Sequence, residues 1–189
     1  MARLRGLLPY DLRVTSVEVA ATGFDARFSA IWRHYTYSVS DAPSGPDPLR
    51  RDVVVHRRPL DVEAMNAAAE PLLGEHDFLA FCRPRPGAST IRELRELRWQ
   101  RAGDLVVGSV RADAFCHHMV RALVGALVAV GDRRRAIEWP AAVLRATRCD
   151  PLVKVMPPHG LVLEEIGYPA PDEMAARARE ARRLRGAVR

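Results

Sequence analysis

Arg121 is the one charged residue in a long apolar stretch, and its chemistry demands a partner. From Met119 to Val130 every other residue is apolar or glycine. A guanidinium stays protonated in a protein, so a buried one requires a carboxylate, a phosphate or a carbonyl group. The residues that would share its face on a helix are His117, His118, Val124 and Gly125. None is acidic, which favours an arginine aimed into a cleft to orient a catalytic carboxylate or a phosphate. The alternative is a side chain that reaches the surface or pairs with a distant glutamate.

Histidine and cysteine residues directly precede this stretch, at Cys116, His117 and His118, and His159 follows later. Adjacent histidines on a helix point about 100° apart and cannot easily bind one ion. The sequence contains no C-x-x-C or H-E-x-x-H motif. We therefore expect no metal site, with one histidine packed and the other near solvent or RNA.

Tyr35 lies in "RHYTY", where Arg33 and His34 precede it. An aromatic ring among cations suits stacking on a base and contact with phosphates. The alternative is an ordinary aromatic residue of a sheet, which we favour for Tyr37. No P-loop, G-x-G-x-x-G or G-x-S-x-G motif is present, so neither a nucleotide-cofactor enzyme nor a serine hydrolase is indicated.

The overall charge agrees with a polyanionic partner without requiring one. The 189 residues carry a net charge of +6, and Lys154 is the only lysine. Arginine binds phosphates and stacks on bases, but a solvated surface that prefers arginine over lysine would look the same. No apolar run approaches the roughly 20 residues of a membrane span, and the start lacks the features of a signal peptide. Cys82, Cys116 and Cys149 are irregularly spaced, so we expect no disulfide framework and a cytoplasmic protein.

The elements that must position these residues follow from periodicity and turn signals. We expect strands over residues 12–19, 27–40, 91–99, 105–112 and 160–169. The apolar spacing of residues 91–99 also fits a helix, but the turn-like "RAGD" and the strand-like residues after it favour a hairpin of the third and fourth strands. We expect helices beginning at Asp61, over residues 115–131, over residues 139–145, and in the tail. This mixture without regular strand–helix alternation predicts an α+β domain, with a largely antiparallel sheet flanked by helices.

Five stretches in order resemble the TruA family of tRNA pseudouridine synthases. They are "FDARFSAIWRHYTYSVSD", "LLGEHDFLAFC", "STIRELRELRW", "FCHHMVRALVGALVAVG" and "PPHGLVLEEIGYP". The resemblance extends roughly from Leu7 to Pro169. It implies the pseudouridine synthase fold and an isomerase that uses an aspartate, without metal or organic cofactor. The expected substrate is tRNA, at uridines 38–40 of the anticodon arm, and the expected assembly is a cytoplasmic homodimer.

The resemblance also implies roles for particular residues. Tyr35 resembles the tyrosine that stacks on the uracil, Arg121 the arginine that pairs with the catalytic aspartate, and Leu161 the apolar residue beneath the base. Tyr35 and Arg121 are thus the predicted catalytic residues. The predicted contacts to substrate are made by Tyr35, Leu161, Arg27, Arg33, His117 and His118.

One family motif, "R-T-D-x-G-V-H", which carries the catalytic aspartate, is not found in this sequence. We therefore expect residues 1–22 to be the remnant of an N-terminal domain, residues 23–170 to form the C-terminal synthase domain, and residues 171–189 to form a helical tail. We expect a chain that lacks the nucleophilic aspartate and is inactive alone. A non-catalytic RNA-binding module, or a purely structural remnant, is the alternative.

Overall fold

The computed structural model describes residues 2–83, 85, 88–146, 148 and 150–186. Its strands are β1 (Trp32–Ser40), β2 (Val54–Val55), β3 (Gly74–Asp77), β4 (Ile91–Ala102), β5 (Leu105–Ala112) and β6 (Leu161–Gly167). Its α-helices are α1 (Ala2–Leu7), α2 (Val62–Ala69), α3 (Met119–Gly131), α4 (Trp139–Arg145) and α5 (Met174–Gly186). Short 3₁₀ turns occupy Glu70–Leu72, Leu79–Phe81 and Pro158–Gly160.

The described strands form one sheet in the order β2-β1-β5-β4-β3, with β6 also paired to β1. Every pairing is antiparallel except the short parallel contact of β2 with β1. β4 and β5 form the expected hairpin, which turns at Gly103 with a φ of +58°. The predicted α+β fold with a largely antiparallel sheet flanked by helices is confirmed.

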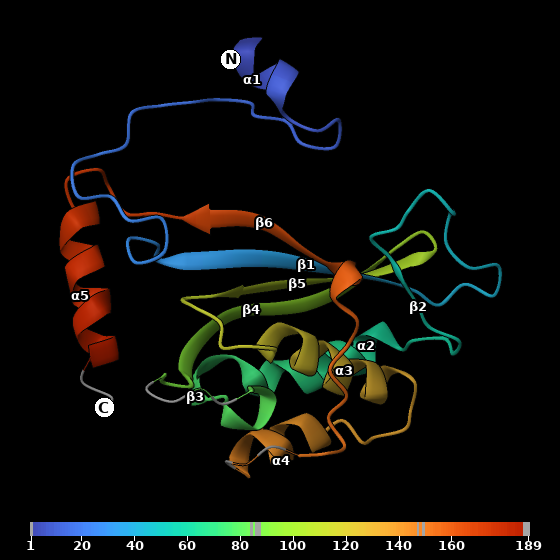
Figure 1. The fold of residues 1–189 in the computed structure, drawn as a ribbon. Coiled ribbons are helices and arrows are strands. Elements are labelled where there is room, and N and C mark those ends of the chain that lie inside the picture. The colour runs from blue at the N-terminus through green and yellow to red at the C-terminus, as the bar shows by residue number, and fades with distance from the viewer. Residues whose placement is uncertain (1, 84, 86–87, 147, 149, 187–189) are drawn as a thin grey trace.

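Helices α2, α3 and α4 cover one face of this sheet (Figure 1). Along β1, Tyr37 and Val39 are fully buried and point toward α3, whereas Thr36 on the opposite face bonds Glu164 near solvent. Twelve of the thirteen residues of α3 are buried, and the exception is Arg121. The apolar stretch that surrounds Arg121 in sequence is therefore the central helix of the core.

Local chemistry explains the limits of α2. Asp61 is its N-cap, because its carboxylate accepts a hydrogen bond from the Ala64 amide at 3.0 Å. Pro71 follows Ala69 and converts the last turn to 3₁₀ geometry, since proline removes a donor and crowds the preceding turn.

Two expectations from the sequence were wrong, one about the existence of a strand and one about where a helix begins. Residues 12–19 form no strand: none of them pairs with a described strand, and Val17 and Val19 are exposed. A β-rich segment gains its hydrogen bonds only from a neighbouring strand. The central helix begins at Met119 rather than Phe115, because His118 adopts a left-handed backbone with a φ of +73°.

The other predicted elements are present, and α1, β2 and β3 were not predicted. β1 is shorter than expected and begins at Trp32, while α4, β6 and the helical tail lie where the sequence placed them. Within the tail, α5 packs on the segment before β1, where the Arg182 guanidinium pairs with Asp25 at 2.6 Å. The division at residues 22/23 and 170/171 stays a prediction. Among the described residues no helix is long and apolar enough to cross a membrane.

Candidate active site

The partner of Arg121 is a backbone carbonyl. Its Nε donates to the Met156 carbonyl oxygen at 2.5 Å, and the Met156 amide donates back to the Arg121 carbonyl at 3.1 Å. No acidic side chain of the described residues forms an ion pair with this guanidinium, which lies part-buried. Two hydrogen bonds thus join Arg121 to Met156 in the segment 153–157. The terminal nitrogens of the guanidinium have no carboxylate partner among the described residues.

Gly125 allows this segment to approach so closely. A Cβ atom at position 125 would overlap the Lys154 carbonyl oxygen. Only glycine accommodates a backbone contact of this kind within a helix. The glycine one turn beyond Arg121 is therefore part of the geometry that sets the arginine.

Tyr37 joins the sheet to the same segment. Its hydroxyl donates to the Pro157 carbonyl oxygen at 2.8 Å, and Gly160 lies against its ring. Burial raises the pKa of Tyr37 to about 12, and the nearby Arg121 charge opposes this rise only in part. Tyr37 is a fully buried core residue, as the sequence favoured, but it also supports the segment that holds Arg121.

Tyr35 and Leu161 lie beside Tyr37. Tyr35 occupies the same face of β1 two residues earlier, and its ring packs edge-on against Phe115 with centroids 5.3 Å apart. Leu161 is paired directly with Tyr37 across β1 and β6. Both are partly buried against the core. The structure therefore gathers Tyr35, Leu161 and Arg121 around Tyr37, between β1 and the start of α3.

His117 and His118 lie just before α3, where their rings stack with centroids 4.1 Å apart. The pKa of His118 is lowered, first by partial burial and then by the positive charges of His117, Arg121, Arg83 and Arg85. These residues therefore form an electropositive cluster beside Arg121. Sequence reasoning missed Arg83 and Arg85 as neighbours of this site, because the contact comes from a loop more than thirty residues upstream.

Arg33 lies near the start of β1, two residues before Tyr35, and Arg27 precedes the strand. Arg33 donates to the carbonyl oxygens of Asp113 at 2.8 Å and Arg27 at 2.7 Å, and burial lowers its pKa. The Arg27 guanidinium lies 5.5 Å from the centre of the Phe28 ring. The structure does not bring these two arginines together with Arg121.

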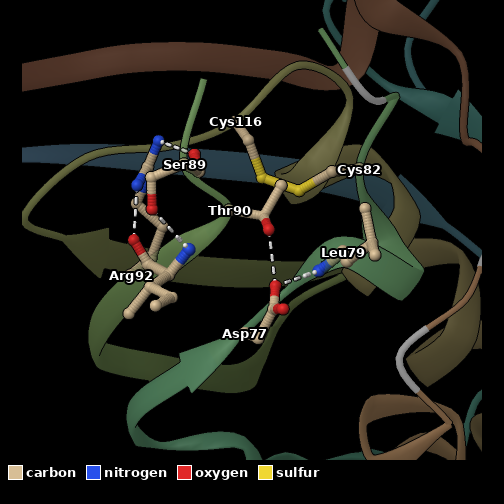
Figure 2. Close-up of a disulfide and its surroundings, with 8 residues drawn as sticks. Asp77, Leu79, Cys82, Ser89, Thr90, Arg92 and Cys116 are labelled. Carbon is tan, nitrogen blue, oxygen red and sulfur yellow. Dashed lines mark hydrogen bonds between the residues drawn. A yellow bond between two sulfur atoms is a disulfide. The ribbon is translucent and has the colours of Figure 1, made fainter. Parts of the chain in front are cut away.

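Cys82 and Thr90, which lie on either side of residues 83–89, each bond to another segment of the chain (Figure 2). Cys82 and Cys116 form a disulfide, with Cα atoms 5.8 Å apart, and Thr90 donates to Asp77 at 2.5 Å. The expectation of no disulfide was wrong for this pair. The two cysteines are 34 residues apart in sequence, and only the packing of the 3₁₀ turn against the start of α3 brings them together. Cys149 lies outside the described residues.

The histidines do not assemble a metal site within the part of the chain that the structure describes. No group of three or more His, Cys, Asp or Glu side chains there is arranged to hold a metal ion. The absence of a metal from the chemistry stays an expectation.

Comparison with known proteins identifies the class of this domain. Residues 68–169, which include β4, β5, α3 and β6, match the model of a family described as tRNA pseudouridine synthase. This stretch contains Arg121, Leu161 and the segment 153–157.

The whole chain is similar to curated proteins named tRNA pseudouridine synthase A. The protein of Streptomyces griseus is 55% identical over 98% of this chain and 66% of its own length. The protein of Frankia casuarinae is 54% identical over 97% of this chain and 68% of its own length. The protein of Mycobacterium leprae is 48% identical over 98% of this chain and 65% of its own length. The chain spans about two thirds of the length of these relatives. It belongs to the tRNA pseudouridine synthase family, whose members are isomerases.

Proposed function

We propose that the protein isomerises uridine to pseudouridine at positions 38–40 in the anticodon arm of tRNA. Family membership supports this, and the observation that carries it is the convergence of Arg121, Tyr35 and Leu161 around Tyr37. In this reaction the N1–C1′ glycosidic bond breaks and a C5–C1′ bond forms. N1 gains a proton and C5 loses one, so the reaction needs no oxidant or reductant.

Each of the three residues has a distinct part in the proposal. The Tyr35 ring stacks on the uracil, held in orientation by its edge contact with Phe115. Leu161 supplies an apolar surface beneath the base. Arg121 pairs with the catalytic aspartate through the guanidinium nitrogens that do not bond Met156, which keeps that carboxylate ionised.

The basic residues near Arg121 and β1 are proposed to contact the RNA backbone. His117 and His118 lie beside Arg121 and are suited to this role. Arg27 and Arg33 are further predicted contacts, and Arg33 already donates two of its five N–H groups to carbonyl oxygens. A phosphate contact at Arg33 would use the donors that remain.

The proposal is tested by release of tritium from tRNA labelled at uracil C5, because the isomerisation displaces that hydrogen. One assay uses the 189-residue chain alone. The other uses the joined protein, in which this chain is fused to the part of the Streptomyces griseus relative that it does not match. We expect release only in the joined protein. Release by the printed chain would overturn the assignment of the nucleophile to the R-T-D motif, and no release in either arm would overturn the function.

A non-catalytic tRNA-binding module is a second candidate, favoured by the lack of an acidic partner for Arg121 among the described residues. It predicts tight, strongly salt-dependent tRNA binding with no tritium release from the joined protein.

We further propose that the protein acts as a homodimer in the cytoplasm and needs no cofactor. The resemblance to the family supports these points. Sedimentation equilibrium tests the first: a mass of one chain at micromolar concentration would contradict it. Full activity after dialysis against a chelator tests the last.

A further inference from the structure

A basic pocket borders the 154–157 segment, whose Met156 carbonyl binds Arg121. It has a volume of about 350 Å³, and its lining includes His56, Arg57, Arg58, Asp132, Arg134 and Lys154. These residues come from β2 and the chain after it, from the C-terminal end of α3, and from the segment itself. We call it the Lys154 pocket.

The one carboxylate of the pocket is already neutralised. The Asp132 side chain is 1% exposed and pairs with Arg134 at 2.6 Å and with His56 at 3.1 Å. Arg57, Arg58 and Lys154 form no ion pair with an acidic side chain among the described residues, and all three are exposed. The pocket therefore carries an excess of positive charge supplied from two facing segments.

Such an arrangement suits a phosphate group. Two guanidinium groups offer planar pairs of donors, and a lysine offers a compact point charge. The bordering residues Met156 and Pro157 are also the ones whose carbonyls bind Arg121 and Tyr37. One short segment thus contributes residues both to this pocket and to the contacts that hold Arg121 and Tyr37.

We propose that the Lys154 pocket binds a backbone phosphate of the tRNA whose uridine occupies the Arg121 site. This rests on the proposed function for the identity of the RNA. The phosphate contact positions the strand across the 154–157 segment and is independent of base sequence.

The uniqueness of Lys154 allows a direct test. Acetylation by a succinimidyl ester modifies only Lys154 and the N-terminal amine, because the chain has no other lysine. We expect saturating tRNA to slow acetylation of Lys154 at least 5-fold, measured by peptide mass spectrometry, with the N-terminal amine as internal control. Inorganic phosphate should protect only at millimolar concentration. Equal protection by micromolar phosphate would reassign the pocket to a small anion, and an unchanged rate with tRNA would overturn the proposal.

Salt dependence supplies the second measurement. Each phosphate contact contributes roughly 0.7 to 0.9 to the slope of log K against log salt, so Lys154→Gln and Arg58→Gln should each lower the slope by about that amount. Arg95→Gln is the matched control, since Arg95 is on β4 and pairs with Glu93 at 2.7 Å. Unchanged slopes in both pocket variants would refute the contact. Protection of Lys154 in this chain together with no tritium release by the joined protein would refute the proposed function and leave the pocket standing.

Discussion

Replacing Gly125 by alanine tests how closely α3 and the segment 153–157 approach one another. The added methyl would overlap the Lys154 carbonyl oxygen and lie 2.9 Å from its carbonyl carbon. Both obstacles are backbone atoms, so the segment must move. We expect Gly125→Ala to separate Met156 from Arg121 and to break both hydrogen bonds between them.

The magnitude follows from two opposing effects. Overpacking against backbone costs about 3 kcal/mol, at the upper end of the usual range. Alanine in place of a helical glycine regains about 1 kcal/mol, which leaves a net destabilisation of about 2 kcal/mol. For a chain of this length that lowers Tm by about 4 to 8 °C.

Thermal unfolding followed by circular dichroism measures the effect. Gly6→Ala is the control, because Gly6 lies in α1 and a Cβ atom there would meet nothing within 4 Å. The control should melt at or slightly above the wild-type temperature. A Gly125→Ala protein that melts as high as the control would refute the close contact and the account of how Arg121 is held.

Three further predictions concern the sheet and its buried groups. The Asn66 amide bonds both the amide and the carbonyl of Trp99, at 2.8 and 2.9 Å, so Asn66→Ala should lower the free energy of unfolding in urea by about 2 kcal/mol; a loss below about 0.5 kcal/mol would contradict this. The Arg101 guanidinium lowers the pKa of Asp41 below its ordinary 3.8, so the stabilisation is present above about pH 4 and lost as pH falls through the lower folded value. The Tm difference between wild type and Asp41→Asn should therefore shrink in acid, and a constant difference would argue against the pair. In ultraviolet titration Tyr37 should ionise near pH 12. The free energy of unfolding should fall between pH 10 and 12, because the unfolded tyrosine ionises first. Ionisation of all tyrosines near pH 10 would contradict the burial of Tyr37.

The parts of the fold that sequence predicted well are those with strong local periodicity. The N-cap at Asp61 follows from local chemistry. For the hairpin of β4 and β5, the turn at residues 101–104 and the strand after it decided between a strand and a helix over residues 91–99. Residues 12–19 show the limit of such reasoning. Their β-branched composition is typical of a strand, but a strand also requires a partner that local sequence does not specify.

Sequence pointed to Arg121 as the one charge in an apolar stretch and to Tyr35 as an aromatic ring among cations, and the resemblance added Leu161 and the proposed roles. The carbonyl that binds Arg121, however, belongs to a residue 35 positions away. Every residue type offers that carbonyl, so no side-chain pattern marks it. The disulfide between Cys82 and Cys116 was missed for a similar reason, since irregular spacing in sequence says nothing about proximity in the fold.

Tritium release by the joined protein, compared between wild type and Arg121→Gln, tests the central claim most directly. Gln keeps a side chain of polar character and removes the charge that would pair with the catalytic carboxylate. We expect the rate of isomerisation to fall by roughly 100-fold or more, while tRNA binding changes little. Loss of the Arg121–Met156 hydrogen bond should lower the free energy of unfolding by only about 1 kcal/mol. A variant that isomerises uridine at the wild-type rate would contradict the role of Arg121 and the site built around it.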